Sequence, residues 1–174
     1  MIWRQGLDSV NSRGLSPAEP EAQKQAEYTL EDFRRNMVGR LMLLGVRDFD
    51  QQHGRLVDYI VDLYATVALF KKGIPTPEQV NDLTGLLDAL TEYTLTHFRN
   101  EEVFMESIGY PQLEQHRKAH QLFIKKFTEI RRKIDGGAVP YVVDLFFLTF
   151  GWLFEHINRV DSAYRDYVLQ RDAL

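Results

Sequence analysis

Residues 111–134 of this chain read PQLEQHRKAHQLFIKKFTEIRRKI. Apolar residues recur through this stretch in alternating steps of three and four, which is the period of one face of an α-helix. His116 and His120 fall on the same face as the apolar residues. The stretch therefore predicts an amphipathic helix over about residues 111–133 that carries two histidines on its buried face.

Three other segments repeat this period and also place ionisable residues among apolar ones. Each predicts a helix that directs at least one histidine toward the interior of the protein. The three stripes run from His53 to Phe70, from Leu83 to Phe104 with His97 and Glu101, and from Leu145 to Val160 with Trp152 and His156.

The connections between these four segments are short and contain glycine and proline. They lie at residues 71–76, 107–111 and 136–140. Thr76, Pro77 and Gln79 also form the pattern of a helix start, with an N-cap residue, a proline at the first helical position and a glutamine that completes a capping box. Short connections join antiparallel neighbours, so we predict an all-α, up-and-down four-helix bundle over residues 45–174.

Residues 1–44 form an extension ahead of this bundle. Residues 9–24 are rich in Ser, Pro, Glu and Gln, which predicts a loop or disorder. Thr29, with Asp32 three residues later, can cap a further helix over about residues 30–44. We expect the apolar stripe of this helix to pack on the bundle or on a second copy of the chain, and the alternative is a protein partner that docks on residues 29–44.

Composition excludes several classes of protein. The chain has 174 residues, a net charge of −4 and a pI near 5.7, which argues against a general nucleic-acid-binding protein. Its most apolar run, residues 139–154, contains Pro140 and Asp144 and is shorter than the ~20 residues of a membrane span. The absence of cysteine and of a secretory signal leads us to expect a cytoplasmic protein.

The inward-facing ionisable residues point to a metal site. An unpaired polar group costs roughly 1–3 kcal/mol when it is buried, and a charge costs more, whereas a shared metal removes that cost. All five histidines of the chain take part, together with two carboxylates that follow a histidine by four or five residues. The set is His53, His97, Glu101, His116, His120, His156 and Asp161. At about 100° per residue, Asp161 lies about 140° around a regular helix from His156, so the helix must loosen locally for both to face inward.

The ligand types narrow the choice of metal. Without cysteine, thiolate sites and iron–sulfur clusters are excluded. A structural zinc ion takes four ligands and would leave the others unpaired, so two metal ions fit better. Imidazoles with bridging carboxylates favour a pair of irons, and manganese or zinc are the alternatives.

The order of these residues resembles the hemerythrin family, and specifically the bacterial hemerythrins, over about residues 45–172. The order reads H, then HxxxE, HxxxH and HxxxxD, and the flanking sequence agrees at residues 49–53, 97–102 and 152–161. The resemblance keeps Asp161 in the set. It implies that His116, His120 and His156 saturate one iron, that His53 and His97 hold the iron that binds dioxygen, and that Glu101 and Asp161 bridge the two.

With one bridging oxygen from solvent, these ligands leave a single open position on a pair of six-coordinate irons. Every histidine is used as a ligand, so none remains as a general acid or base. We therefore predict reversible dioxygen binding for storage, delivery or protection, and no enzymatic activity. The alternatives are an oxygen or redox sensor that acts through the N-terminal extension, and a di-iron enzyme that reduces peroxide or nitric oxide.

A dry pocket is expected around the open position. Trp152 lies one helical turn before His156, and Phe98, Phe104 and Leu153 are further candidates for its wall. An apolar wall would hinder the entry of protons and slow the oxidation of the iron.

Overall fold

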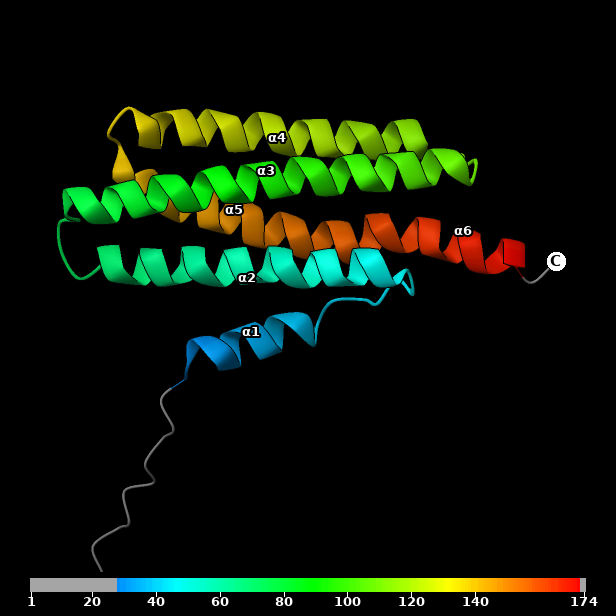
Figure 1. Ribbon diagram of the computed structural model, residues 1–174, viewed down its shortest axis with the longest axis horizontal. Helices are drawn as coiled ribbons and strands as arrows, with labels where there is room; N and C mark the ends of the chain where they lie inside the picture. Colours follow the sequence, from blue (N-terminus) through cyan, green and yellow to red (C-terminus); the bar gives the residue numbers. More distant parts are fainter. Residues whose placement is uncertain (1–27, 173–174) are drawn as a thin grey trace, which may run out of the picture.

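The computed structural model describes residues 28–172, which are mainly helical (Figure 1). Figure 1 shows α2, α3, α4 and the α5–α6 segment lying side by side as long, roughly parallel rods, with α1 against α2. The helices are α1 (Leu30–Val38), α2 (Arg47–Phe70), α3 (Pro77–Ser107), α4 (Leu113–Asp135), α5 (Val142–Glu155) and α6 (Ser162–Asp172). The predicted all-α four-helix bundle is confirmed.

The fourth rod of the bundle is made of several pieces. A short 3₁₀-helix, η1 (Val139–Tyr141), leads into α5, and a π-helical segment, η2 (His156–Asp161), joins α5 to α6 without a break. Contacts of α2 with both α3 and α5, and of α4 with both α3 and α5, close the bundle. The interior is therefore enclosed on four sides.

The helix boundaries follow the local signals in the sequence. The Thr76 side chain accepts a hydrogen bond from the Gln79 amide, and the Gln79 side chain accepts one from the Thr76 amide, so the predicted capping box is present. The predicted helix over about 111–133 begins at Leu113 and ends at Asp135. Differences of two residues are ordinary for helix ends.

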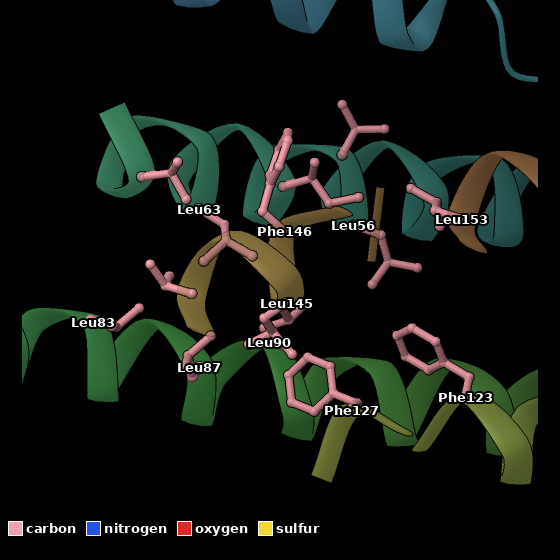
Figure 2. Close-up of a cluster of buried hydrophobic side chains, with 14 of the residues drawn as sticks. Leu56, Leu63, Leu83, Leu87, Leu90, Phe123, Phe127, Leu145, Phe146 and Leu153 are labelled. Carbon is pink, nitrogen blue, oxygen red and sulfur yellow. The ribbon is translucent and has the colours of Figure 1, made fainter. Parts of the chain in front are cut away.

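Apolar side chains fill the bundle in two separate clusters. The larger cluster draws residues from α2, α3, α4 and α5 (Figure 2): Leu56, Leu63, Leu83, Leu87, Leu90, Phe123, Phe127, Leu145, Phe146 and Leu153. The smaller cluster comprises Leu44, Phe49, Met105, Tyr110 and Tyr164. In α2, α3 and the fourth rod, the predicted ligands fall between residues of the first cluster and residues of the second. A polar layer thus separates the two cores.

The N-terminal helix is shorter than predicted. It begins at the Thr29 capping box but ends at Val38, not near residue 44. The chain then leaves the helical path, and Asp50 of α2 accepts hydrogen bonds from the amides of Leu44 (2.7 Å) and Gly45 (3.1 Å). Gly45 has a φ of 76°, a conformation that glycine adopts without strain. This turn buries Leu44 in the smaller cluster, which a continuous helix would not allow.

The expected packing of this extension on the bundle is observed. Met37 is buried, and the Phe33 ring lies 4.6 Å from that of Tyr64 and 6.2 Å from that of Phe150. The segment 9–24, for which we predicted a loop or disorder, lies outside the described residues. No helix within residues 28–172 is long and apolar enough to cross a membrane.

Candidate metal centre

The polar layer between the two apolar clusters brings together all seven residues selected from the sequence. Each has at most 3% of its surface exposed, and Glu101 and Asp161 have none. α2 contributes His53, α3 contributes His97 and Glu101, α4 contributes His116 and His120, and the π-helical segment contributes His156 and Asp161. Four separate rods therefore converge on one site.

Three imidazoles in this layer form a nearly equilateral triangle. The Nε2 atoms of His116 and His120 are 3.1 Å apart, those of His120 and His156 are 3.0 Å apart, and those of His156 and His116 are 3.2 Å apart. Three neutral rings cannot make three mutual hydrogen bonds here, because each Nε2 either donates or accepts and at least two of the three must therefore play the same role. The His120 Nδ1–H already donates to the Glu102 carboxylate, which leaves its Nε2 as an acceptor. Nitrogen ligands at about 2.1 Å from one ion and at right angles to one another would lie about 3.0 Å apart. The triangle fits one face of a metal coordination shell.

The two carboxylates each lie between histidines of both groups. Asp161 Oδ1 lies 3.0 Å from His156 Nε2 and 3.3 Å from His116 Nε2, whereas its Oδ2 lies 3.5 Å from His53 Nε2. Glu101 Oε2 faces His120 at 3.5 Å and His97 at 3.6 Å, whereas its Oε1 faces His53 at 3.7 Å. Carboxylates placed in this way can bridge two cations.

The π-helical segment explains how His156 and Asp161 share a face. In a π-helix the hydrogen bonds link residues five apart, so residues i and i+5 lie on neighbouring turns. The predicted loosening of the helix is therefore present over residues His156–Asp161. The irregularity lies at the site, where π-bulges are common in proteins.

Three residues that are not among the seven predicted ligands orient members of the layer. Gln52 Oε1 lies 3.0 Å from His97 Nδ1, and Glu102 Oε1 lies 2.9 Å from His120 Nδ1. Each contact fixes the tautomer that leaves Nε2 free to bind a metal. The Tyr164 hydroxyl donates a hydrogen bond of 2.9 Å to Glu101 Oε1. Gln52 and Glu102 are adjacent in the sequence to the predicted ligands His53 and Glu101, and this adjacency could have identified them. Tyr164 is not adjacent to a predicted ligand.

Burial shifts the pKa values of these groups strongly in the absence of metal. It lowers the pKa of His97 to about 4, and it lowers the pKa of His156 well below its usual value. Burial and the charge of Glu101 raise the pKa of Asp161 well above its usual value. Burial also raises the pKa of Tyr164, and nearby Glu101 and Asp161 add to this effect, so its hydroxyl stays protonated and remains a donor.

Several buried polar atoms in the layer have no hydrogen-bond partner among the described residues. They are both ring nitrogens of His53, Nδ1 of His116, Oε2 of Glu101 and both carboxylate oxygens of Asp161. Buried polar groups normally find partners, and this many orphans in one place is costly. Two groups of these residues have ligand atoms within 4.8 Å of one another: Glu101 with His116, His120 and His156, and Glu101 with His53 and His97. The donor set fits two cations that share Glu101.

Aromatic rings cover one side of the layer. Phe98 stacks on His120 with ring centroids 3.7 Å apart, and Trp152 stacks on His156 at 4.0 Å. A cavity of about 10 Å³ lies beside them, which is near the lower limit for one water-sized molecule. It is lined by Leu56, Ile60, Thr94, Phe123, Thr149, Trp152 and Leu153.

Two of the four residues predicted for the pocket wall, Trp152 and Leu153, line this cavity. Phe98 lies behind Trp152 at 5.2 Å between ring centroids and does not line it. Phe104 does not line this cavity either. Phe104 lies one turn beyond Glu101, on the opposite side of the polar layer, where it packs against Phe49 at 5.3 Å and Tyr164 at 6.0 Å.

The chain is similar in sequence to known proteins. A family model, the Hemerythrin HHE cation binding domain, matches residues 44–167. A bacteriohemerythrin of Stenotrophomonas maltophilia is 32% identical over 125 residues, which cover 72% of this chain and 76% of that protein. A bacteriohemerythrin of Pseudomonas aeruginosa is 33% identical over 124 residues, covering 71% and 75%. Myohemerythrin-1 of Phascolopsis gouldii is 33% identical over 81 residues, covering 47% and 62%.

The hydroxyl of Tyr164 provides a test of the layer's outer support. We expect Tyr164→Phe to lower metal affinity about 10- to 100-fold, because Glu101 loses the donor that holds one of its oxygens in place. Competition with a chelator measures the affinity. Tyr167→Phe is the matched control, since its hydroxyl donates to the Gly109 carbonyl and to no ligand among the described residues. An equal loss in both variants would contradict the role of Tyr164.

The metal-free protein should lose stability as the pH falls. The folded state resists protonation of His97 and His156, whose pKa values are depressed, whereas the unfolded chain protonates them near pH 6.5. At these two histidines the unfolded state therefore binds more protons below pH 6.5, and each destabilises the fold by up to about 1.4 kcal/mol per pH unit until its own folded-state pKa is reached. Asp161, whose folded-state pKa is raised, takes up a proton more readily in the folded state and offsets part of this loss. Urea denaturation between pH 7 and pH 4 checks this expectation, and a free energy of unfolding that stays constant over that range would refute it.

Proposed function

The chain belongs to the hemerythrin family, and on that basis we propose that it binds dioxygen reversibly at a non-haem di-iron centre, as a carrier for storage, delivery or protection. The observation that supports this proposal best is the buried layer of five histidines and two carboxylates. Its donor atoms suit two cations, and its orphaned atoms lack partners otherwise.

The proposed ligands divide into two groups and two bridges. The Nε2 triangle of His116, His120 and His156 would hold one iron, and His53 and His97 would hold the other. Glu101 and Asp161 would bridge the irons. Asp161 divides its oxygens between His53 and the triangle, and Glu101 lies near both groups of histidines. Two irons held here would supply the electrons for binding dioxygen and recover them on its release.

The residues of the chain do the remaining work of holding and shielding. Gln52 and Glu102 keep two imidazoles in a fixed tautomer, and Tyr164 retains its proton while it positions Glu101. The stacked rings of Phe98 and Trp152 exclude water from one side of the layer. The neighbouring cavity of about 10 Å³, near the lower limit for one water-sized molecule, is lined mainly by apolar side chains.

We propose a carrier and not a catalyst because no proton-transfer group is left over at the centre. All five histidines have Nε2 in the layer, and the Nδ1 atoms of His97 and His120 are already engaged. General acid or base catalysis needs a group that is free to reach the substrate. The alternative, a peroxide or nitric oxide reductase, would lack such a group among the described residues.

The carrier proposal is tested by iron analysis and optical spectra of the protein reduced without air, after addition of oxygen and after its removal. We expect about two irons per chain and a visible absorption band that appears with oxygen and vanishes reversibly. His116→Ala should hold less iron and lose the band, while its exposed neighbour Gln115→Ala should behave like the unchanged chain. Irreversible loss of the band, turnover of peroxide with an electron donor, or a metal other than iron would contradict the proposal.

One observation supports a sensor as a second candidate function. Asn158 lies in the π-helical segment between His156 and Asp161, and its side chain binds the segment that follows α1. Its Oδ1 accepts a hydrogen bond from the Met42 amide (2.7 Å), and its Nδ2 donates one to the Arg40 carbonyl (3.1 Å). A shift of the π-helical segment would therefore change the hydrogen bonds that hold the N-terminal extension.

Hydrogen exchange of the reduced and oxygenated protein tests the sensor. If the extension responds to the centre, amide protection over residues 40–44 should differ between the two states, and Asn158→Ala should abolish the difference. Arg159→Ala is the control, because Arg159 is exposed and, among residues 28–172, pairs with Glu155 alone. Equal protection in both states of the unchanged chain would rule out this function.

A further inference from the structure

Charge is distributed unevenly over the molecule. α4 carries seven Lys or Arg residues and only three Asp or Glu residues, a net charge of +4. Because the whole chain has a net charge of −4, the remaining residues together carry −8. One helix of an acidic protein is therefore strongly basic.

Most of these cations have no anionic partner. Arg117 pairs with acids on α3 and α4, and Arg131 pairs with Asp88 and Asp135. No ion pair to a residue within 28–172 engages the other five, although Lys133 lies over the Tyr141 ring at 4.2 Å. These five exposed residues are Lys118, Lys125, Lys126, Arg132 and Lys133.

The five unpaired cations lie along one side of α4. At about 100° per residue, they fall within about 120° of the helix circumference, and at 1.5 Å per residue they extend over about 22 Å. His116 and His120 lie on the opposite side of the helix, in the polar layer. Figure 1 shows α4 at one edge of the bundle along its full length, so its outer side faces away from the other helices.

An exposed leucine lies within this basic stripe. Leu122 is 60% exposed, and it is separated by three or four residues from Lys118, Lys125 and Lys126, which are its neighbours on the helix surface. A polyanion such as nucleic acid would use the cations but gain nothing from the leucine. A membrane surface would need a broad apolar face. On this side of α4 the residue between the lysines and Arg132 is Glu129, which is exposed and charged, so the apolar surface does not extend beyond Leu122.

We propose that the outer side of α4 docks an acidic protein partner, with Leu122 as the apolar anchor and the surrounding lysines as the electrostatic guide. Complementary charge speeds encounter and sets orientation, while a central apolar side chain supplies much of the binding energy. The docked partner lies about one helix diameter, roughly 10 Å, from the histidines on the inner side of α4. The surface belongs to the helix itself and does not depend on the proposed iron centre.

The test measures binding of the full chain to a fluorescent Glu-rich helical peptide that carries a leucine face, with poly-glutamate of equal charge for comparison. We expect the leucine-bearing peptide to bind more tightly and its affinity to fall with salt. The double variant K125E/K126E should weaken binding at least about 10-fold. Leu122→Ser should weaken binding severalfold for the leucine-bearing peptide and leave poly-glutamate unaffected.

The double variant K71E/K72E is the matched control, because it reverses two exposed lysines at the far end of α2 and should leave binding unchanged. Circular dichroism of each variant verifies that the helices are retained. Equal binding of both ligands with no dependence on Leu122, tighter binding to duplex DNA, or Leu122-dependent binding to phosphatidylserine vesicles would overturn the proposal. The proposal would also be overturned if the peptide did not bind, or if sedimentation showed self-association that K125E/K126E abolishes.

Discussion

The structure depends on the need to satisfy a layer of ionisable groups in the middle of an apolar bundle. Five imidazoles and two carboxylates are buried together, and the layer divides the interior into two apolar clusters. Without a cation, burial depresses the basicity of His97 and His156 and favours the neutral acid of Asp161. A pair of cations would also favour the neutral imidazoles, whose nitrogens bind metal, but would reverse the preference of Asp161, because positive charge stabilises its carboxylate.

The surrounding residues respond to the same constraint. Gln52 and Glu102 each engage one imidazole at Nδ1, and Tyr164 reaches across from α6 to Glu101. The fourth rod is π-helical and not α-helical over residues His156–Asp161, which allows both of its ligands to face inward. These features have little purpose in an apolar core, and together they orient the donors before any metal binds.

α4 illustrates how one helix serves two different surfaces. Its inner side carries two histidines and two buried phenylalanines, while its outer side carries unpaired cations and an exposed leucine. The N-terminal extension is tied to the same centre by another route, through Asn158 in the π-helical segment. The polar layer is thus within short reach of two features on the protein surface.

The sequence by itself determined the helices, the bundle and the identities of the seven inward-facing residues. These depend on short-range physics: the 3.6-residue period, the capping box at Thr76 and the spacing of histidines along each helix. The tertiary structure alone decided how the two carboxylates divide their oxygens, that Tyr164 supports Glu101, that Phe104 lies on the far side of the layer, and that α1 ends at Val38. Those features arise from contacts between rods that are distant in the sequence, and the helical period says nothing about how side chains from different rods meet. The π-helical segment was determined in part by each. The five-residue spacing of His156 and Asp161 required the helix to loosen locally, and the tertiary structure decided that the loosened segment is a π-helix over residues His156–Asp161.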